Sequence, residues 1–535
     1  MNDTHQVLNQ VPPLEDYDAY TSNVWLAAAM ARAGVGWVTD AAVTLGRFVG
    51  SAEAQQHAAD ANRFTPQLRS HDRSGRRIDA VDYHPSYHAL MTRALESGLH
   101  SLAWKREPGG FSARAALNYL WNELEQGTSC PVTMTFASIP VFEHAPALQR
   151  EWRDKVLADH YDPRPLPLAR KSGVTVGMAM TEKQGGSDLR AVQTAAVPDG
   201  GHHRLTGHKW FCSAPMSDGF FTLARLAEGV TCFFVPRSLA DGTRNVFRIQ
   251  RLKDKVGNRS NASSEIEYED TAAWIVGEPG RGIPTLIEMA HHTRFDIVVA
   301  VAGMMRAALD HALHHARHRS AFGRALVDQP LMARVLADLA LEAEAAALLA
   351  FRLAQSFDAA RAGDKREASL QRALTPVAKY WVSKRMPAVA LEAMECLGGN
   401  GYVEESPLAR LYREAPLNGI WEGSANVICL DALRAFAKSP EAFDALAAQI
   451  DDKALVDRVR ALLKDEAAEA NARSIVETLA VAIQAALMDR YADRVAADAF
   501  RARLTGWGRS GAFGNVASDA DAAAILKRLS PLRAA

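Results

Sequence analysis

Residues 173–189 read GVTVGMAMTEKQGGSDL, a short apolar, β-branched run that gives way to a polar loop with two adjacent glycines. A run of this length bounded by glycine is typical of a β-strand. The two glycines would let the backbone approach a flat or phosphorylated ligand, with Thr181 and Ser187 as hydrogen-bond partners. A plain turn between two strands has the same composition, so the loop alone leaves both interpretations open.

Further runs of the same kind follow until about residue 277. They read RLTGHKWFCSA, GFFTLARL, GVTCFFVPR and SSEIEYED, and clusters of Gly, Asp, Asn and Pro such as PDGG separate them. The intervals hold no helical pattern of about 10–15 residues, which argues against a doubly wound parallel sheet. The sequence therefore predicts a compact β-domain over residues 174–280.

Helical patterns flank this β-domain on both sides. Residues 21–64 are alanine-rich and amphipathic, and Pro163, Pro165 and Pro167 forbid a continuing helix near the boundary. From about residue 280 to 438 three long runs return to the helical period, which suggests a bundle. We predict an α+β fold in four parts: an N-terminal arm and helical domain (1–173), a β-barrel-like middle domain (174–280), a helical bundle (281–440) and a C-terminal helical extension (441–535).

Bulk properties narrow the class of protein. A chain of 535 residues should divide into several domains, and no apolar run reaches the ~18 residues of a membrane span. The first twenty residues lack the basic-then-apolar pattern of a signal peptide. Five scattered cysteines without a CxxC pair favour reduced thiols in a cytoplasm. The net charge of −1 excludes a basic footprint over the whole chain, so any nucleic-acid site would be local.

Several common sites are absent from the sequence. It contains no P-loop, no G-x-G-x-x-G opening a helix after a strand, no G-x-S-x-G and no H-E-x-x-H. His311, His315 and His318 recur on one helical face, but no carboxylate obviously converges on them. We interpret these histidines as a helix flank beside Arg317 and Arg319, and we predict no metal site.

Four more motifs follow the loop of residues 180–189 in a recognisable order. They are GHKWFCSA (207–214), HRSAFGRAL (318–326), LGGNGY (397–402) and IWEGSANV (420–427). On this helix–sheet–helix layout the set resembles the acyl-CoA dehydrogenase flavoproteins over about residues 175–438. The stretches CPVTMTFAS (130–138), RLKDKVGNRSNAS (251–263) and LYRE (411–414) extend the resemblance to most of the chain. They are similar to the AidB branch of that family, which belongs to the response to DNA alkylation.

The resemblance implies FAD and a set of residues that contact it. In the strand-rich region these are Met178, Met180, Thr181, Gly186, Ser187, Trp210, Phe211, Cys212 and Ser213. In the helical region they are Arg319, Phe322, Glu395, Gly398, Gly399, Trp421, Gly423, Ser424 and Asn426. Arg319 and Phe322 match residues that reach the FAD of a neighbouring subunit, which implies a homo-oligomer, most simply a tetramer. The family usually has Thr at the Cys212 position, so Ser213 or a backbone N–H would replace its hydrogen bond.

Simpler interpretations of some of these residues stay open. The glycines of LGGNG are common at the end of a helix, where they need no ligand, and Trp210 could be an ordinary core residue. The joint occurrence of the motifs in family order favours the cofactor site.

The resemblance also implies a catalytic base. Glu422 matches the family carboxylate that removes the α-proton of an acyl thioester, and Arg294 matches a residue near that carboxylate at the start of a helix. A plain helix-start acid is the alternative for Glu422, because acids are favoured there. The acid that usually stands three residues before the arginine is missing, and residues 291–293 read HHT. A bulky basic loop (251–263) replaces a smaller segment, so a long acyl-CoA would fit poorly and the dehydrogenase activity would be weak or vestigial.

The AidB resemblance implies binding of double-stranded DNA through the C-terminal extension. From Glu441 onward there are 13 Lys+Arg against 14 Asp+Glu, but from Asp489 onward there are 8 against 5. The candidate DNA-binding residues are Arg490, Arg494, Arg501, Arg503, Arg509, Lys527 and Arg528. Asp493 and Asp498 lie at helical spacing from Arg490 and Arg494, so a solvated, salt-bridged face is equally consistent.

Two functions from different classes follow. The first is a cytoplasmic FAD protein of the alkylation response that binds DNA and protects or repairs it. A variant of this function is a protein that only covers DNA and catalyses no reaction. The second is an ordinary acyl-CoA dehydrogenase, an oxidoreductase of the CH–CH group acting on a short or branched acyl-CoA, whose extension serves only oligomerisation.

Overall fold

The computed structural model describes residues 4–505, 511–515 and 518–529, which form two compact units. We call residues Gln56–Gly110 and Glu125–Asp296 the β unit, and residues Met1–Gln55, Phe111–Leu124 and Ile297–Ala535 the helical unit. Three helices, α3 (Ala52–Arg63), α6 (Gly110–Leu124) and α10 (Gly282–His318), cross from one unit to the other along the chain. The four-part division of the sequence stays a prediction.

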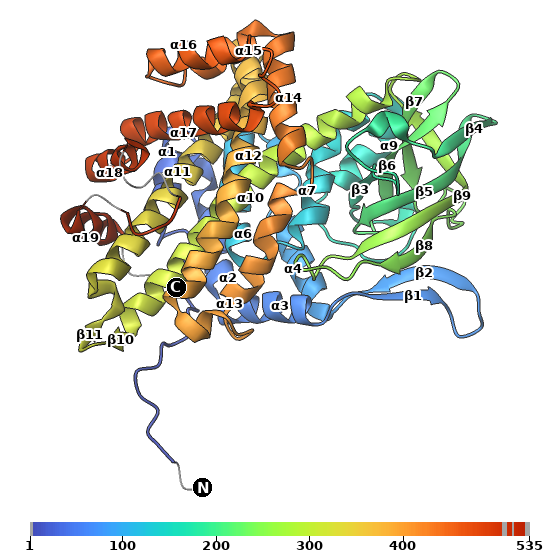
Figure 1. Cartoon of the computed structure of the whole chain (residues 1–535). Helices are drawn as coiled ribbons and strands as arrows, with labels where there is room; N and C mark the ends of the chain where they lie inside the picture. The colour runs from blue at the N-terminus through green and yellow to red at the C-terminus, as the bar shows by residue number, and fades with distance from the viewer. Residues whose placement is uncertain (1–3, 506–510, 516–517, 530–535) are drawn as a thin grey trace. The chain divides into compact units, whose positions relative to one another are not determined.

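The β unit is built on one seven-stranded sheet that curls on itself (Figure 1). Its strand order is β3-β6-β4-β5-β9-β7, β8 pairs with β9, and an additional pairing of β6 with β7 closes the ring. The strands are β3 (Val176–Ala179), β4 (Ala195–Asp199), β5 (His202–Ser213), β6 (Gly219–Leu226), β7 (Gly229–Pro236), β8 (Arg248–Leu252) and β9 (Ser263–Val276). Only β3–β6 and β4–β6 are parallel. All five predicted runs are strands, and no doubly wound sheet is present among the described residues.

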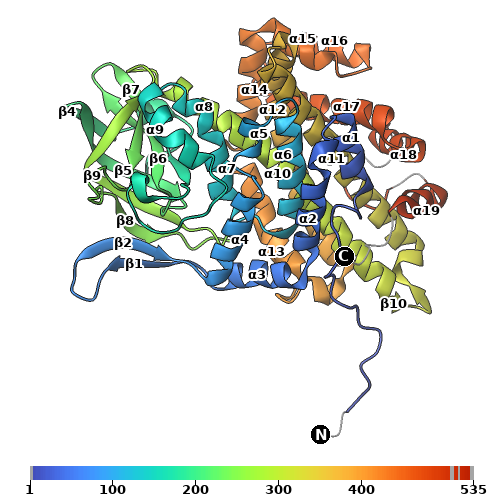
Figure 2. The same ribbon diagram turned by 180° about the vertical axis from the view of Figure 1, so that it is seen from behind.

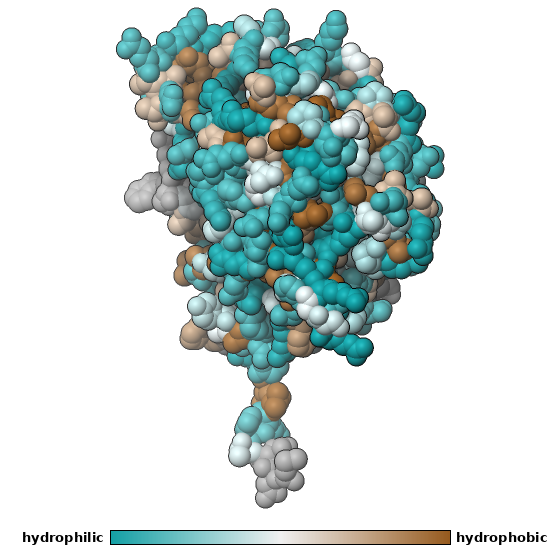
Figure 3. Space-filling view, turned by 90° about the vertical axis from the view of Figure 1, so that its right-hand side faces the viewer, coloured by the Kyte–Doolittle hydropathy of each residue, from teal (hydrophilic) through white to brown (hydrophobic). Residues whose placement is uncertain are grey.

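Aromatic side chains fill the interior of this barrel. Phe220, Phe233 and Phe247 are almost completely buried in one cluster, and burying each such side chain contributes about 1.5–3 kcal/mol. Gly177 makes room for the first of these rings, because a Cβ on it would lie 2.5 Å from a carbon of Phe220. The outer face of the unit is mostly hydrophilic, with apolar residues scattered over it (Figure 3). Strands β3, β6 and β7 are buried along nearly their whole length, which matches the continuous apolar runs in their sequence.

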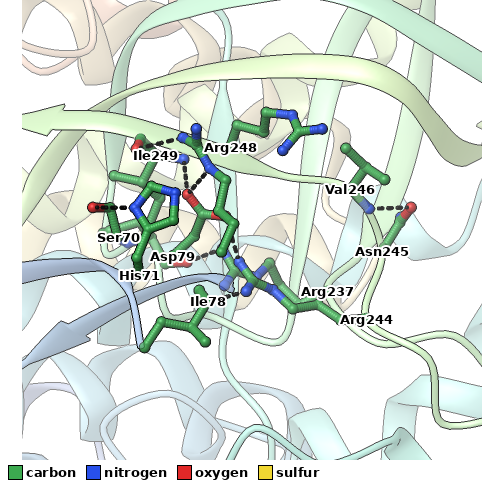
Figure 4. A network of polar contacts seen from close by, with 12 residues as sticks. Ser70, His71, Ile78, Asp79, Arg237, Arg244, Asn245, Val246, Arg248 and Ile249 are labelled. Atoms are coloured by element: carbon green, nitrogen blue, oxygen red, sulfur yellow. Dashed lines mark hydrogen bonds and ion pairs between the residues drawn. The ribbon is translucent and has the colours of Figure 1, made fainter. Parts of the chain in front are cut away.

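A hairpin that the sequence did not predict is fixed to the barrel by one aspartate. Strands β1 (Gln67–His71) and β2 (Arg77–Asp82) form it, inside a region predicted to be helical. Asp79 is buried with a φ of +41° and accepts hydrogen bonds from Arg77 Nε (3.0 Å), Arg244 (2.9 Å) and the backbone N–H of Ile249 in β8 (2.9 Å) (Figure 4). The hairpin depends on these tertiary contacts, since its sequence has no β-branched alternation.

Short helices complete the β unit. They are α4 (Pro85–Glu96), α5 (Leu102–Lys105), α7 (Ser129–Ala137), α8 (Ile139–Phe142) and α9 (Pro146–Val156). After α9 the chain runs without an α-helix to β3, through the segment with the three prolines. The break in helix that Pro163, Pro165 and Pro167 predict is thus confirmed.

Long helices form the centre of the helical unit. They are the C-terminal part of α10, α11 (Pro330–Arg361) and α12 (Lys365–Cys396), and α1 (Val24–Arg32) lies beside α11 (Figure 2). The prediction placed the start of the first long helix near Thr293, but α10 begins eleven residues earlier. The segment before Thr293 contains Pro284, which a first helical turn tolerates. Arg294 consequently lies inside a helix and not at its start.

Two features of these helices bear on the predictions. Helix α10 is long and apolar enough to cross a membrane, but 83% of its most apolar window is buried inside the protein, as expected of a core helix. Helix α12 contains Pro376 and Pro387 in its interior, and it begins ten residues before the predicted run, where Asp364 accepts hydrogen bonds from two backbone N–H groups.

The C-terminal extension packs against the central helices of the same unit. Trp381 Nε1 of α12 donates a 2.7 Å hydrogen bond to Oε1 of the buried Gln484 in α17. The remaining helices of the unit are α2 (Thr39–Gly50), α13 (Pro407–Glu414), α14 (Ala425–Lys438), α15 (Pro440–Ala447), α16 (Lys453–Leu462), α17 (Ala472–Tyr491), α18 (Arg494–Thr505) and α19 (Asp519–Arg528).

Candidate functional site

The loop after β3 lies against β5 and brings two predicted cofactor residues together. The backbone N–H of Trp210 donates a 2.8 Å hydrogen bond to the carbonyl of Thr181. Gly186 folds back on the same threonine, because a Cβ on it would lie 2.3 Å from Thr181 Oγ1. At this position the loop therefore needs glycine for close packing. Ser187 is exposed beyond it.

A buried ion pair that the sequence analysis did not name holds this loop in place. Lys209 Nζ lies 2.7 Å from Glu182 Oε1, and both side chains are fully buried. Glu182 also accepts hydrogen bonds from Thr194 Oγ1 (2.6 Å) and the backbone N–H of Gln193 (2.7 Å). Burial opposes the charged carboxylate, but Lys209 and these hydrogen bonds outweigh it and hold the pKa of Glu182 at about 2. Burial lowers the pKa of Lys209 to about 8, so the pair is charged at neutral pH.

Both residues flank positions that the motifs had singled out. Glu182 follows Thr181, and Lys209 precedes Trp210. A lysine and a glutamate on adjacent β-segments were the available signal, but only the fold shows that their side chains meet.

Basic side chains of the predicted bulky loop cover one aromatic face of the site. Lys253 Nζ lies 3.3 Å from the ring centroid of Trp210 and 4.8 Å from that of Phe211, which is 49% exposed. Glu265 pairs with Lys253 (2.5 Å) and with Arg251 (2.6 Å). Cations over an aromatic face are attracted by its quadrupole. Trp210 is accordingly a half-buried surface residue of the β unit and not part of its core cluster.

The neighbouring cysteine faces the other side of the strand. Cys212 is completely buried in the barrel core, where burial raises the pKa of its thiol to about 12. Ser213, one position on, is half-buried, and its Oγ lies 3.4 Å from Ser263 Oγ. The structure thus places the side chain of Ser213, rather than that of Cys212, on the accessible side. Met178 is buried and Met180 half-buried in the same region.

In the helical unit, the predicted base lies in a strained loop before α14. Glu422 has a φ of +55° and Gly423 a φ of +104°, and Ser424 is the N-cap. Glu422 therefore lies outside the first helical turn, which contains no acid. The buried Lys379 of α12 holds the loop in place, because its Nζ donates hydrogen bonds to the carbonyls of Trp421 (3.0 Å) and Gly423 (2.6 Å).

The N-terminus of α14 lies at an exposed surface. The side chain of Ser424 makes no capping hydrogen bond, and both Ser424 and Asn426 are exposed. Free N–H groups at the start of a helix, together with the helix dipole, favour a phosphate or another anion.

A short hairpin after α10, whose strands have two residues each, contains the predicted cofactor residue Phe322 and follows directly on Arg319. Strands β10 (Ser320–Ala321) and β11 (Arg324–Ala325) hold Phe322 at the tip, where its φ is +52° and its side chain is 98% exposed. The N-terminal arm supports the hairpin, because Asn9 exchanges two 2.8 Å hydrogen bonds with the backbone of Ser320 and accepts one from Arg319. The side chain of Phe322 therefore has almost no contact with the described part of its own chain.

The end of α12 combines a cap with an open surface. Gly398 has a φ of +59°, the conformation that commonly ends a helix, so the capping interpretation is confirmed. A Cβ on Gly398 or Gly399 would have no atom within 4 Å, and Glu395 is exposed one turn earlier. The described residues contain no group of three or more His, Cys, Asp or Glu side chains that could hold a metal ion.

The chain matches three family models in order. These are the adaptive response protein AidB N-terminal domain (residues 9–163), the acyl-CoA dehydrogenase middle domain (177–271) and the acyl-CoA dehydrogenase C-terminal domain (280–437). Over 448 residues it is 46% identical to AidB of Escherichia coli (strain K12), whose name classes it with the acyl-CoA dehydrogenases, and the match covers 83% of this chain and 82% of the relative. The chain belongs to the acyl-CoA dehydrogenase family.

Two solved structures share the fold of this chain. The apo-form of Bd2924 has a TM-score of 0.84 at 28% identity and covers 90% of this chain and all of that one. Caenorhabditis elegans ACDH-11 in complex with C11-CoA has a TM-score of 0.84 at 23% identity and covers 99% and 94%. The predicted fold, with N-terminal helical, middle β and C-terminal helical domains, is confirmed.

Acyl-CoA dehydrogenases are FAD proteins, and the residues of this chain fit that cofactor. The uncapped N-terminus of α14 suits a phosphate, and the open surface at Gly398 and Gly399 gives room for a bulky group. The prediction of FAD is confirmed at the level of the family, while the individual contacts stay predictions.

Four of the candidate DNA-binding arginines in the C-terminal extension form ion pairs. Arg490 pairs with Asp451, Arg494 with Asp498, Arg501 with Asp489 and Arg528 with the buried Glu344. The predicted pair of Arg494 and Asp498 is confirmed, whereas Arg490 pairs with Asp451 instead of Asp493. Lys527 is exposed at the end of α19. The side chain of Arg503 and the whole of Arg509 lie outside the described residues.

Proposed function

We propose that the protein is an FAD-dependent oxidoreductase that dehydrogenates a short or branched acyl thioester. When bound, FAD supplies the acceptor for the hydride that leaves the β-carbon. Glu422 accepts the α-proton, which requires a carboxylate fixed within hydrogen-bond reach of that carbon. We assign Arg294, a buried residue of α10, the supporting role that the family resemblance implies.

The conformation of Glu422 carries this proposal. A non-glycine residue with positive φ costs of order 1–3 kcal/mol and persists only when its surroundings enforce it. Here the surroundings are two hydrogen bonds from Lys379 to the residues on either side. Glu422 also lies outside the first turn of α14, which contains no acid.

The exposed Phe322 supports a homo-oligomer in which copies share their cofactor sites. We propose that Phe322 and Arg319 contact the FAD of a neighbouring copy in a tetramer. A guanidinium suits the pyrophosphate, because it donates several hydrogen bonds in a fixed geometry.

Replacing the base tests the reaction. We expect Glu422→Gln to bind FAD as the wild type does, because the amide keeps the shape of the side chain. Anaerobic titration with a short acyl-CoA should bleach the flavin absorbance of the wild type and leave that of the variant unchanged. Equal bleaching of both proteins would reduce Glu422 to a structural residue.

A second candidate function is binding of double-stranded DNA, with a role in protection against alkylation and with weak dehydrogenase activity. The relative at 46% identity is AidB, and Arg494 is 75% exposed despite its ion pair. All five cysteines are buried and none forms a disulfide, which fits the reducing cytoplasm where we place the protein. We expect a gel shift of duplex DNA that is weakened by replacing Arg494, Arg501 and Arg503 together with Ala. A shift of equal strength would move the DNA site elsewhere.

A further inference from the structure

One arginine of the C-terminal extension contacts the start of α14, where we place the cofactor. Arg473 Nε donates a 2.8 Å hydrogen bond to Oδ1 of Asn426. Asn426 is the second residue of α14, and Arg473 is the second residue of α17. Both side chains lie in exposed residues, 47 positions apart in the sequence.

Both ends of this contact are attached to firmly packed helices. In α17, Ile475, Val476 and Leu479 are buried, and Gln484 accepts the hydrogen bond from Trp381 described above. In α14, Ile428 and Cys429 are buried. The two helices contact each other, so the position of Arg473 relative to Asn426 is fixed by core packing.

The chemistry of the two side chains determines which end of the amide faces outward. An asparagine amide has an acceptor oxygen on one side and a donor NH₂ group on the other, whereas a guanidinium only donates. Arg473 therefore binds the oxygen of Asn426 and turns its Nδ2 away. Without a partner of fixed polarity, the amide could present either end to a ligand at the helix start.

We propose that Arg473 is a positioning residue of the cofactor site, which orients Asn426 so that its Nδ2 donates a hydrogen bond to an oxygen of FAD. This inference rests on the proposed FAD site at the N-terminus of α14. The C-terminal extension is then part of the flavin site, because it supplies the residue that sets the polarity of a cofactor contact.

Three substitutions at one position test this role, with the dissociation constant of FAD and the visible spectrum of the flavin as readouts. Arg473→Met removes the donor and should weaken FAD binding about fivefold to tenfold, the size of one ordinary hydrogen bond. Arg473→Lys keeps a pure donor and should restore most of the affinity. Arg473→Glu should weaken binding most, because its carboxylate accepts from Nδ2 and turns Oδ1 toward the cofactor.

Arg458→Glu is the matched control. Arg458 is exposed on α16 of the same extension, so this variant makes the same change of charge away from α14 and should bind FAD as the wild type does. Equal losses in Arg458→Glu and Arg473→Glu would assign the effect to net charge and overturn the inference.

A double variant separates positioning from direct contact. If Arg473 acts through Asn426, Arg473→Met should have no further effect on FAD binding in an Asn426→Ala background. Additive losses, or full FAD affinity in Arg473→Met and Arg473→Glu, would overturn the inference and leave the proposed function intact. A wild-type protein that binds no FAD would overturn the proposed function itself.

Discussion

At the scale of single residues, the site depends on a lysine that was not itself predicted to contact the cofactor or the substrate. Lys379 is 1% exposed, and its ammonium group binds the carbonyls of Trp421 and Gly423. These two contacts bracket Glu422 and hold its backbone in the left-handed region. The sequence identified Glu422 from its neighbours, but not Lys379, which lies more than forty positions away in a helix with no motif around it.

We expect Lys379→Met to release this loop. The substitution keeps the apolar stem but removes the donor from two part-buried carbonyls, at up to about 1–3 kcal/mol for each. The free energy of unfolding should fall, and reduction of bound flavin by acyl-CoA should slow much more than FAD binding weakens. Urea titration and stopped-flow absorbance measure the two effects. Flavin reduction at the wild-type rate would show that the loop keeps its conformation without Lys379.

The ion pair of Glu182 and Lys209 gives the stability a dependence on pH. The folded-state pKa of Glu182, about 2, is lower than that of a free glutamate, so the charged carboxylate stabilises the fold above about pH 4.5. That contribution is lost as the pH falls from about 4.5 toward 2. We expect Glu182→Gln to be less stable than the wild type at pH 7, with a difference that shrinks over this range. Urea unfolding at several pH values measures it, and a difference that does not change with pH would contradict the assignment.

At the scale of elements, local patterns predicted those parts whose own sequence carries the signal. The strands of the barrel core are short runs of β-branched and aromatic residues, and the three long helices repeat apolar residues with the helical period. The hairpin of β1 and β2 escaped prediction, because the contacts of Asp79 with β8 and Arg244 hold it in place. The first ten residues of α12 also escaped, whereas its interior was predicted as helix although it contains Pro376 and Pro387.

The hairpin of β1 and β2 should become more mobile when Asp79 loses its charge. We expect Asp79→Asn to speed cleavage by trypsin at the arginine-rich tip, residues 72–77, because Arg77 and Arg244 lose their ion pairs. Asp82→Asn is the control, since Asp82 and its partner Arg69 are both 57% exposed and such pairs contribute little. Electrophoresis of timed digests compares the variants. Equal cleavage of both would show that Asp79 does not anchor the hairpin.

At the scale of the whole molecule, the order of the motifs carried more information than any one of them. Each glycine-rich loop alone was as consistent with a turn as with a ligand, and only their sequence along the chain indicated the family. The contacts of Lys379, of Arg473 and of Lys253 could not be predicted, because they join segments that are distant in sequence and carry no shared pattern. The identities of the residues were enough to propose the site. The contacts that hold its loops in place depend on packing and were not predicted.

Assembly should depend on the tip of the small hairpin after α10. We expect Phe322→Asp to lower both the oligomeric mass and the FAD content, because a charge would replace an aromatic ring at a contact between copies. Light scattering and the flavin-to-protein absorbance ratio measure these effects, with Arg324→Asp on the same hairpin as the control for charge. A tetramer with full FAD content in the Phe322 variant would remove this residue from the interface.

The ion-paired arginines of the extension should make the affinity for DNA depend only weakly on salt concentration. Each phosphate that a protein cation neutralises releases about one counterion, so affinity falls more steeply with salt as more cations take part. An arginine that already faces a carboxylate, as Arg490, Arg494, Arg501 and Arg528 do, releases no counterion until that pair opens. The logarithm of DNA affinity should therefore decline with the logarithm of salt concentration along a shallow line. A steep line would mean that the duplex pulls these arginines away from their acids.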